Sequence, residues 1–295
     1  MWITQFSDNA LVAAISDRRP RGAPRAPTCD GRRPPLQPAV SLYFEILPKI
    51  LLAVLFCASS LPAATKEEVV AHLLSLRNTT DYTAVARLVR VEPSGERKNN
   101  SITVRAHAFP DGLRIFCDVT APAAARARLL VFVPSSGPAL IRTGHAGDPS
   151  PQTLPWEKWS ESLLGTDFSY EDLLENEVLW RRQTILREEQ FGARTCYVLR
   201  SEPGPAEHSQ YASVTGWFDR DAYQKVKMEK VLKASGEVKV FTYYGLRQVK
   251  GVWSASQIEC KVNGTPGTSL LIINRGAEKP HLERTAFDSA LLIKP

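Results

Sequence analysis

The sequence predicts an α+β fold: a curved antiparallel sheet with an N-terminal helix and a central helical lid. Three observations support this prediction: helical periodicity at the start of the domain, about ten segments with two-residue periodicity, and turn residues between consecutive segments. An antiparallel sheet with that many strands must curl. We therefore expect its concave face to be filled by helices, by a ligand or by both.

The first predicted element is an amphipathic helix over residues 66–76, KEEVVAHLLSL. Its apolar side chains fall on one side and its charged side chains on the other. From Tyr82 the period changes to two, which predicts strands. The predicted strands of the first half cover residues 84–91, 102–109, 113–119 and 127–133, with a turn at residues 110–112.

Residues 146–155 are rich in Gly, Pro and Asp, and we expect the sheet to break there. Residues 156–174 then have helical character, which makes them the central lid. Strands return after this segment, with hairpin turns at residues 234–237 and 263–264, where the residue types tolerate positive φ. The predicted strands of this second half cover residues 183–188, 195–200, 214–219, 226–232, 238–244, 255–262 and 268–273.

Residues 1–64 are expected to direct export rather than to fold. Residues 1–48 are Pro- and Arg-rich and predict a disordered leader; the alternative is a gene-model artefact with the true start near Val40 or Leu42. Residues 49–64 combine Lys49, the apolar stretch ILLAVLFCA and a small-residue end, which are the three parts of a secretory signal peptide. We therefore expect a periplasmic protein whose residues 65–295 form a single domain.

Composition and charge exclude several classes of protein. Seven of the 37 Lys and Arg and four of the 31 Asp and Glu lie in residues 1–64, so the predicted domain carries a surplus of only three positive charges. That balance is typical of an ordinary surface and argues against a nucleic-acid partner. Apolar runs stay well below the ~20 residues of a spanning helix, which excludes a multi-pass membrane protein.

Catalytic and metal-binding motifs are missing, so we expect neither an enzyme nor a metal or cofactor site. The five histidines form no local ligand pair, and the common nucleophile, zinc, phosphate and dinucleotide motifs do not occur. Cys117, Cys196 and Cys260 lie in alternating apolar patterns, which favours small core residues. One disulfide among them is the alternative in an oxidising compartment.

The predicted lid contains an acidic cluster, Asp167, Glu171 and Asp172. These carboxylates are consistent with a general acid and base, but helix capping by Thr166 or Asp167, with the other two near the positive helix end, is the favoured interpretation. The surrounding apolar side chains either pack on the sheet or cover an apolar cavity for a lipid chain. The residues predicted to form the lid and contact lipid are Trp156, Trp159, Leu163, Leu164, Phe168, Tyr170 and Leu173.

Residues 163–174, LLGTDFSYEDLL, resemble the central signature of the LolA-like family of outer-membrane lipoprotein-sorting proteins. The matching residues are Gly165, Thr166, Asp167, Phe168, Ser169, Tyr170, Glu171, Asp172 and Leu173. The export signal, the opening helix and the turn and strand at residues 110–115 agree with this resemblance, which extends over residues 65–295. It implies an incomplete antiparallel β-barrel, with helices covering its mouth, that holds acyl chains.

The resemblance further implies a monomeric, non-catalytic carrier, or chaperone, for lipoprotein acyl chains or another lipid. It also implies an inner-membrane transporter as donor and an outer-membrane acceptor. Carriage needs a dry cavity, because exposing an acyl chain to water costs ~0.8 kcal/mol per CH₂. The alternative is an envelope scaffold, or an accessory protein of a lipid transporter, whose cavity is filled by its own side chains.

The sequence departs from the family at one position. In carriers of this fold, an arginine before the proline that ends an early strand hydrogen-bonds the lid shut. Here Phe109 precedes Pro110, and Arg105 or Arg114 is the candidate substitute. We therefore expect the open and closed states to be balanced differently in this chain.

Overall fold

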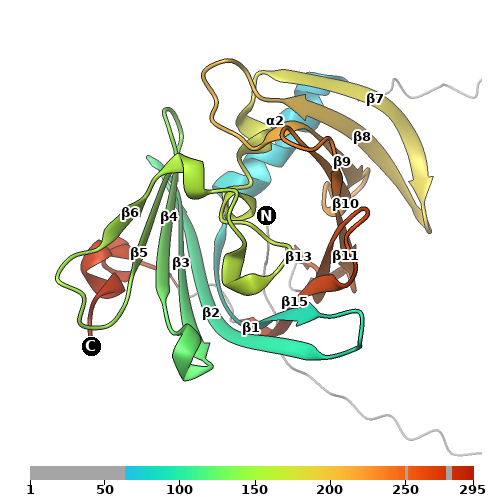
Figure 1. The fold of residues 1–295 in the computed structure, drawn as a ribbon. Helices are drawn as coiled ribbons and strands as arrows, with labels where there is room; N and C mark the ends of the chain where they lie inside the picture. The colour runs from blue at the N-terminus through green and yellow to red at the C-terminus, as the bar shows by residue number, and fades with distance from the viewer. Residues whose placement is uncertain (1–63, 250–251, 277–280) are drawn as a thin grey trace, which may run out of the picture. The chain divides into compact units, whose positions relative to one another are not determined.

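The computed structural model describes residues 64–249, 252–276 and 281–295. The predicted leader and, except for Ala64, the predicted signal peptide lie outside these residues. The described domain contains one α-helix, α2 (Lys66–Asn78), followed by an antiparallel sheet of 13 strands (Figure 1).

Helix α2 begins at a capping box. The Thr65 hydroxyl accepts a hydrogen bond from the Glu68 backbone N–H, and the Glu68 carboxylate accepts one from the Thr65 N–H at 2.8 Å. Val69, Leu73 and Arg77 are the buried residues of this helix. Leu73 and Leu76 line a pocket together with Tyr82, Ala106 and Ile115 of the sheet, so the helix covers one part of the concave face.

The sheet consists of two meanders that meet at a central strand pair. Strands β1 to β6 follow one another in the first meander and β7 to β11 in the second; β14 pairs with β11, and β15 pairs with both β14 and β1. The strands are β1 (Asp81–Val91), β2 (Arg97–Phe109), β3 (Gly112–Ala121), β4 (Arg128–Pro134), β5 (Leu140–Gly144), β6 (Gln152–Leu154), β7 (Arg182–Phe191), β8 (Arg194–Glu202), β9 (Tyr211–Asp219), β10 (Lys225–Leu232), β11 (Val238–Tyr244), β14 (Gln257–Val262) and β15 (Thr268–Gly276). A separate hairpin consists of β12 (Arg247–Val249) and β13 (Val252–Ser254).

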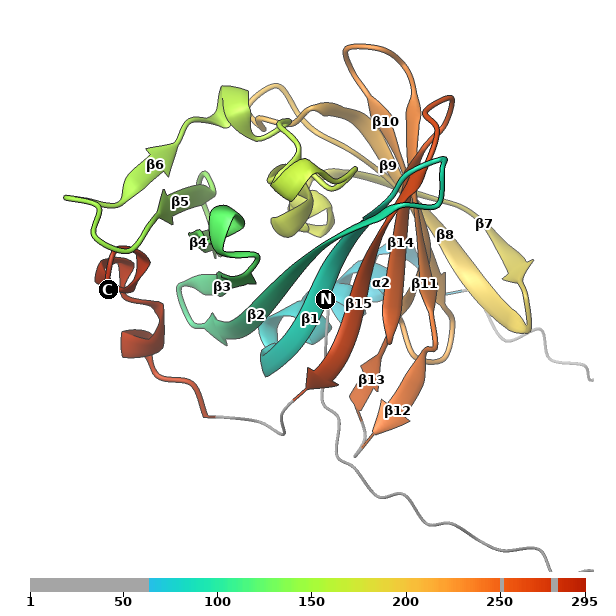
Figure 2. The same cartoon turned by 60° about the horizontal axis from the view of Figure 1, so that its bottom comes forward.

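The sheet is strongly curved but not closed, since β6 and β7 are its two edges among the described residues (Figure 2). Residues 155–181, here called the insert, connect these edges. Both ribbon views place the insert inside the curve of the sheet. The predicted curved, incomplete antiparallel sheet is confirmed.

The expected break at residues 146–155 is wrong. Strand β6 lies within that stretch and pairs with β5, with Ile141 opposite Leu154. The Gly- and Asp-rich residues form the turn between them, where Gly147 has φ +89° and the Asp148 carboxylate accepts a hydrogen bond from the His145 N–H at 2.7 Å. A three-residue strand is too short to show a period of two.

The C-terminal segment packs on the outer face of the first meander. Two 3₁₀ turns, η6 (Arg284–Phe287) and η7 (Ser289–Leu292), place Phe287 and Leu292 against Phe116 of β3 and Leu130 of β4. Alternation along β3 then directs its other residues, such as Cys117, to the concave side. The first meander is therefore covered on both faces.

Candidate functional site

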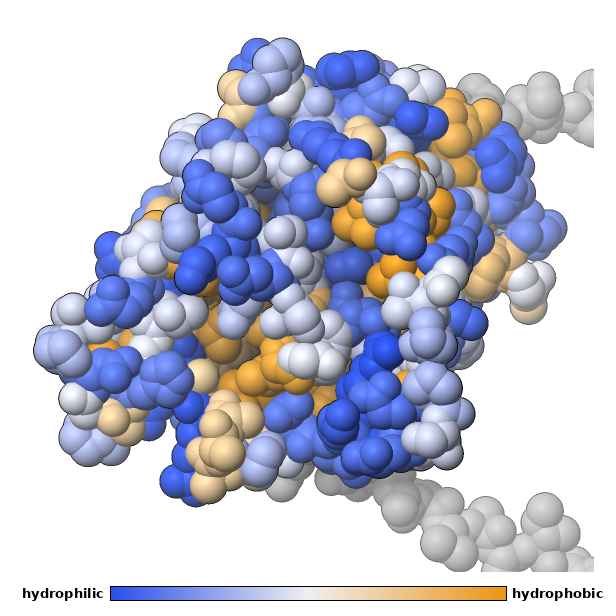
Figure 3. Space-filling model, viewed as in Figure 1, coloured by the Kyte–Doolittle hydropathy of each residue, from blue (hydrophilic) through white to orange (hydrophobic). Residues whose placement is uncertain are grey.

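An apolar pocket lies on the concave face of the first meander, and the insert closes it. The insert leaves a cavity of only about 60 Å³ between itself and the sheet. In Figure 3 hydrophobic surface lies at the bottom of a hollow beside the insert. The sheet residues that line the pocket are Tyr82, Ala86, Leu88, Ile102, Val104, Ile115, Cys117, Val119, Leu129 and Leu271.

The alternation of β-strands explains this lining. The even-numbered residues of β1 and β2 and the odd-numbered residues of β3 point to one side of the sheet. These positions are apolar over residues 82–88, 102–108 and 113–119, whereas Arg90, Lys98 and Asn100 are polar exceptions at one end of β1 and β2. A second pocket lies under helix α2 and shares Tyr82 and Ile115 with the first. The two pockets therefore adjoin on the concave face, and the second is lined by the charged side chains of Arg77, Glu175, Glu177 and Lys225 as well as by apolar residues.

The structure brings four of the seven predicted lid residues to this pocket. Leu163, Leu164, Phe168 and Leu173 line it from the side of the insert. Trp156, Trp159 and Tyr170 are not among its lining residues. Trp156 is 48% exposed and stacks on His208, whereas Trp159 is buried and donates its indole N–H to the Leu154 carbonyl at 3.1 Å.

The insert is not the helix that its sequence predicts. It contains four short 3₁₀ turns: η2 (Trp156–Lys158), η3 (Leu163–Gly165), η4 (Glu171–Leu173) and η5 (Asn176–Leu179). Leu164 at φ +53° and Gly165 at φ +72° adopt left-handed conformations, which a right-handed helix does not accommodate. A β-bridge between Ser162 and Ser169 closes the loop around them. The apolar residues whose spacing suggested a helix instead include Leu163 and Phe168, which this loop buries.

The capping interpretation of the acidic cluster is right only in part. Glu171 and Asp172 lie in the first turn of η4, as expected, but Tyr170 precedes that turn rather than Thr166 or Asp167. Asp172 is in addition buried among cations. Its side chain is 1% exposed, and its two oxygens each lie 3.0 Å from an ammonium nitrogen, that of Lys230 on β10 and that of Lys239 on β11. Tyr211 donates its hydroxyl to the same carboxylate at 2.7 Å, and the Ser169 N–H donates at 2.8 Å. Burial alone would raise the pKa of Asp172, but the two lysines hold it well below its usual range.

Asp167 is likewise paired rather than capping a helix. Its carboxylate contacts the guanidinium of Arg90 on β1 and accepts the Ser269 hydroxyl at 2.9 Å. Arg90 also donates to the Pro266 carbonyl at 2.8 Å, so it joins the insert to the turn between β14 and β15. Thr166 donates its hydroxyl to the Leu163 carbonyl at 2.7 Å within the loop.

Two further carboxylates of the insert converge on Lys225 of β10. Its ammonium nitrogen lies 3.2 Å from carboxylate oxygens of both Glu175 and Glu177. Burial alone would raise the pKa of Glu177, but Lys225 lowers it to about 2. Glu171 is held by neutral donors, the Ser209 hydroxyl and the Gln210 N–H at 2.8 Å, and burial raises its pKa. The insert is therefore fixed to the sheet by polar contacts along its length.

Sequence reasoning missed the cations that receive these carboxylates. Lys230 follows Met228 at a spacing of two and Lys239 precedes Phe241 at the same spacing, so both lysines share the inward face with buried apolar residues. A lysine at an inward-facing position of an alternating strand was the sequence feature that could have predicted these buried cations. Their meeting with Asp172 depends on tertiary structure, which the sequence does not reveal.

The two arginines considered as latch substitutes lie on the outer face. Arg105 donates to the Ala286 carbonyl at 2.6 Å, and Arg114 forms hydrogen bonds of 2.9 and 2.8 Å with Asp111. Phe109 packs edge to face against Phe287 of the C-terminal segment. Arg90, on a different strand, does contact the insert with its guanidinium.

Within the described ranges, no three His, Cys, Asp or Glu side chains come together as a metal site would require. Cys117, Cys196 and Cys260 are free thiols and buried. The helix found in the described part of the chain lacks the length and apolar character needed to cross a membrane.

Comparisons with known proteins identify the fold. A family model described only as an uncharacterized protein matches residues 151–293. None of the curated proteins compared with the sequence matches it. Among solved structures, a domain described as an outer membrane lipoprotein-sorting protein from Vibrio parahaemolyticus is similar, with 19% identity, a TM-score of 0.68, and coverage of 76% of this chain and 96% of that chain.

Two other structures are similar over about the same share of this chain. A DUF1329 family protein from Desulfovibrio piger has 14% identity and a TM-score of 0.69, covering 76% of this chain and 96% of that chain. A LolA superfamily protein from Nitrosomonas europaea has 16% identity and a TM-score of 0.61, covering 78% of this chain and 100% of that chain. The large, unclosed antiparallel sheet is therefore a LolA-like fold.

Proposed function

We propose that this protein is a periplasmic carrier that binds acyl chains of a lipoprotein, or of another lipid, in the concave pocket and takes part in outer-membrane lipoprotein sorting. The observation that carries the proposal is the apolar lining of the pocket, supplied by the sheet and covered by a separate loop. Exposing an acyl chain costs ~0.8 kcal/mol per CH₂, so such a surface is what a carrier requires. The predicted export signal and the similarity to the lipoprotein-sorting structure support the compartment and the cargo class.

The insert gives this carrier its mechanism. Leu163 and Phe168 are 7% and 2% exposed, so they fill the space that an acyl chain would use. Loading therefore displaces the insert from the concave face, and release returns it. Because the insert connects two sheet edges and has no ladder hydrogen bonds to either meander, it can move while the sheet keeps its pairing. The donor would be an inner-membrane transporter and the acceptor an outer-membrane protein, with the carrier acting as a monomer and without catalysis.

A second candidate is a non-catalytic scaffold or transporter accessory whose cavity is permanently filled. The buried charge pairs of Asp172 and Glu177 favour it, because breaking them on every cycle opposes motion of the insert. The two candidates differ in one measurable property. A carrier takes up lipid, and a scaffold does not.

The experiment is native mass spectrometry, with lipid extraction, of the protein purified from the periplasm of a bacterium that expresses the full chain. A carrier retains close to one lipid or acylated peptide per chain. The Val104→Trp variant fills the pocket from its partly exposed wall and should lose most of the bound lipid. Val85→Trp, on the exposed outer face of the neighbouring strand, is the matched control and should keep it. If the wild-type protein contains no bound lipid and does not bind a fluorescent acyl probe, the scaffold is favoured over the carrier.

A further inference from the structure

The insert and the concave wall carry opposite charges. Residues 167–177 of the insert contain five carboxylates and no Lys, Arg or His. Four of the five are paired with cations supplied by the sheet: Asp167 with Arg90, Asp172 with Lys230 and Lys239, and Glu175 and Glu177 with Lys225. The wall under the insert is therefore basic as well as apolar.

Lys230 and Lys239 stand out among these cations because they are direct cross-strand partners. The register of β10 and β11 places one opposite the other. Their side chains are 7% and 5% exposed. Like charges opposite one another destabilise a sheet, more so when they are withdrawn from water. The pair therefore requires an anion, which the Asp172 carboxylate provides at 3.0 Å from each nitrogen.

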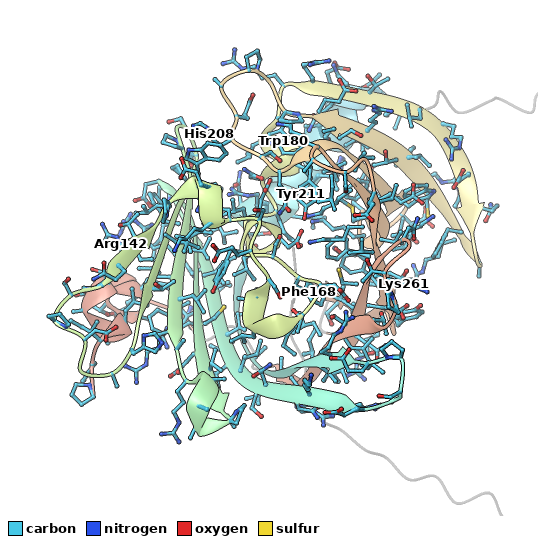
Figure 4. All side chains as sticks on the ribbon, in the orientation of Figure 1. Arg142, Phe168, Trp180, His208, Tyr211 and Lys261 are labelled. Carbon is cyan, nitrogen blue, oxygen red and sulfur yellow. The ribbon has the colours of Figure 1, made fainter. Side chains whose placement is uncertain are left out.

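The lysine pair adjoins the apolar pocket. Phe168 lines that pocket and also meets Phe241 of β11, with ring centroids 5.7 Å apart. The Lys230 ammonium lies 4.9 Å from the same Phe241 ring. Figure 4 shows Phe168 and Tyr211 on the inner side of the sheet, where Tyr211 also donates to Asp172. The insert thus places apolar side chains in the pocket and an anionic group at its end, as an amphiphile would.

We propose that Lys230 and Lys239 form the headgroup site for an anionic amphiphile, a carboxylate or a phosphate on an acyl chain, which takes the place of the Asp172 carboxylate. This inference rests on the proposed function, because the insert has to leave the concave face first. When Asp172 leaves with it, two ammonium groups remain side by side on an apolar wall. An anionic headgroup restores their pairing, whereas a neutral ester cannot.

The alternative is that the three residues form a structural ion pair only. A structural pair explains the burial of Asp172, but it makes no distinction between lipids of the same chain length. A headgroup site predicts such a distinction. Charge-assisted hydrogen bonds are about twice as strong as neutral ones, and those to charged groups contribute enough for about a tenfold preference.

The test compares three ligands with the same 16-carbon chain: palmitate, hexadecyl phosphate and methyl palmitate. Each is titrated below its aggregation concentration into the delipidated protein, purified from the periplasm after expression of the full chain. We expect at least one anionic ligand to bind about tenfold more tightly than methyl palmitate. The anion that binds more tightly identifies the headgroup as carboxylate or phosphate.

Two substitutions connect that preference to the lysine pair. Lys239→Gln should abolish the preference while leaving binding of methyl palmitate within about twofold. Lys261→Gln, at an exposed position of the adjacent strand β14 (Figure 4), is the matched control and should retain the preference. Asp172→Asn removes the competing carboxylate and keeps its shape. Because the insert has to leave for every ligand, this substitution should tighten binding of all three, and at least one anionic ligand should still bind about tenfold more tightly than methyl palmitate. Asp172→Asn also provides an independent test if Lys239→Gln does not fold.

Two results would overturn the inference, and they differ from each other. If the three ligands bind equally well to the wild type, and also equally well to Asp172→Asn, the headgroup site is eliminated and the acyl-chain carrier is left standing. Failure of all three ligands to bind the wild type and the Asp172→Asn variant would contradict the proposed function itself, and the headgroup site with it.

Discussion

Phe168 of the insert meets Phe241 of β11 edge to face, with ring centroids 5.7 Å apart and both side chains at most 2% exposed. The two rings come from a connecting loop and from the middle of the sheet. Their contact shows that the insert contributes to the core and does not simply lie over it. Any movement of the insert must therefore break aromatic packing as well as ion pairs.

The Phe168→Ala substitution measures this packing. Removing a buried phenylalanine side chain costs ~3–5 kcal/mol, so we expect the free energy of unfolding in urea to fall by about that amount. Trp156→Ala is the control, because Trp156 is 48% exposed and contacts His208 at the surface. Its effect should stay below ~1 kcal/mol. If Phe168→Ala were as mild as the control, the insert would not be part of the folded core.

The Asp167→Asn substitution tests the link between the insert and β1. It removes the charge that pairs with Arg90, a contact in which both side chains are mostly buried. We expect backbone amides of residues 163–168 to exchange with deuterium about fivefold to thirtyfold faster, corresponding to ~1–2 kcal/mol, with no change in β1 or β15.

The control for this exchange experiment is Asp221→Asn, since the Asp221 side chain is 91% exposed. It should leave protection of the insert unchanged. Uniformly faster exchange over the whole sheet in Asp167→Asn would mean that the insert opens only when the domain unfolds. That result would favour the scaffold over the carrier.

The strands were largely predictable from the sequence, whereas the insert was not. A period of two persists over seven or more residues in strands such as β1 and β10, so local patterning is enough to find them. In the insert, the same kind of local pattern pointed to a helix. Its conformation is decided instead by Arg90, Lys230 and Lys239, which lie more than 50 residues away in the chain.

The candidate site was predictable from the sequence only in part. Leu163 and Phe168 were identified from hydrophobicity, because apolar residues in a connecting segment seek an apolar surface. Capping by Asp167 was wrong, and the position of Asp172 in the first turn of η4 was right, but local reasoning missed the cations that pair with both, because these partners are distant in the chain. Pairing register places Lys230 opposite Lys239, and register cannot be read from alternation alone.

The pH dependence of stability follows from the pair formed by Glu177 and Lys225. The pKa of Glu177 is lowered from 4.5 in the unfolded chain to about 2 in the fold. Because the pKa is lower in the folded state, the ionised Glu177 carboxylate stabilises the fold fully above about pH 4.5. This stabilisation is lost as the pH falls toward 2. The loss is on the order of 3 kcal/mol.

This sign is checked by urea unfolding at pH 7, 4.5 and 3. The Glu177→Gln variant should be less stable than the wild type at pH 7. The difference in the free energy of unfolding should shrink at pH 3, because the ionised carboxylate of the wild type then contributes less stability. Glu96→Gln, at an exposed turn position, should follow the wild type at every pH. A difference between Glu177→Gln and wild type that stayed constant with pH would refute the assignment.

Two buried cysteines on opposite faces of the sheet report directly on movement of the insert. Cys117 lines the apolar pocket, whereas Cys196 packs on the other face with Val198, Trp217 and Val226. Burial raises the pKa of Cys117 to about 12 and that of Cys196 to about 11. Because the thiolate is the reactive form, neither should react with iodoacetamide at pH 8 while the protein is closed.

Opening of the insert uncovers the pocket wall but not the opposite face. We therefore expect peptide-resolved mass spectrometry to show faster alkylation of Cys117 than of Cys196, and Asp167→Asn to accelerate only Cys117, by about the same fivefold to thirtyfold as the amide exchange. Equal rates at the two thiols, changing together with urea concentration, would mean that both become accessible through global unfolding. The insert would then be a fixed part of the core, and a cycle of loading and release through this pocket would be ruled out.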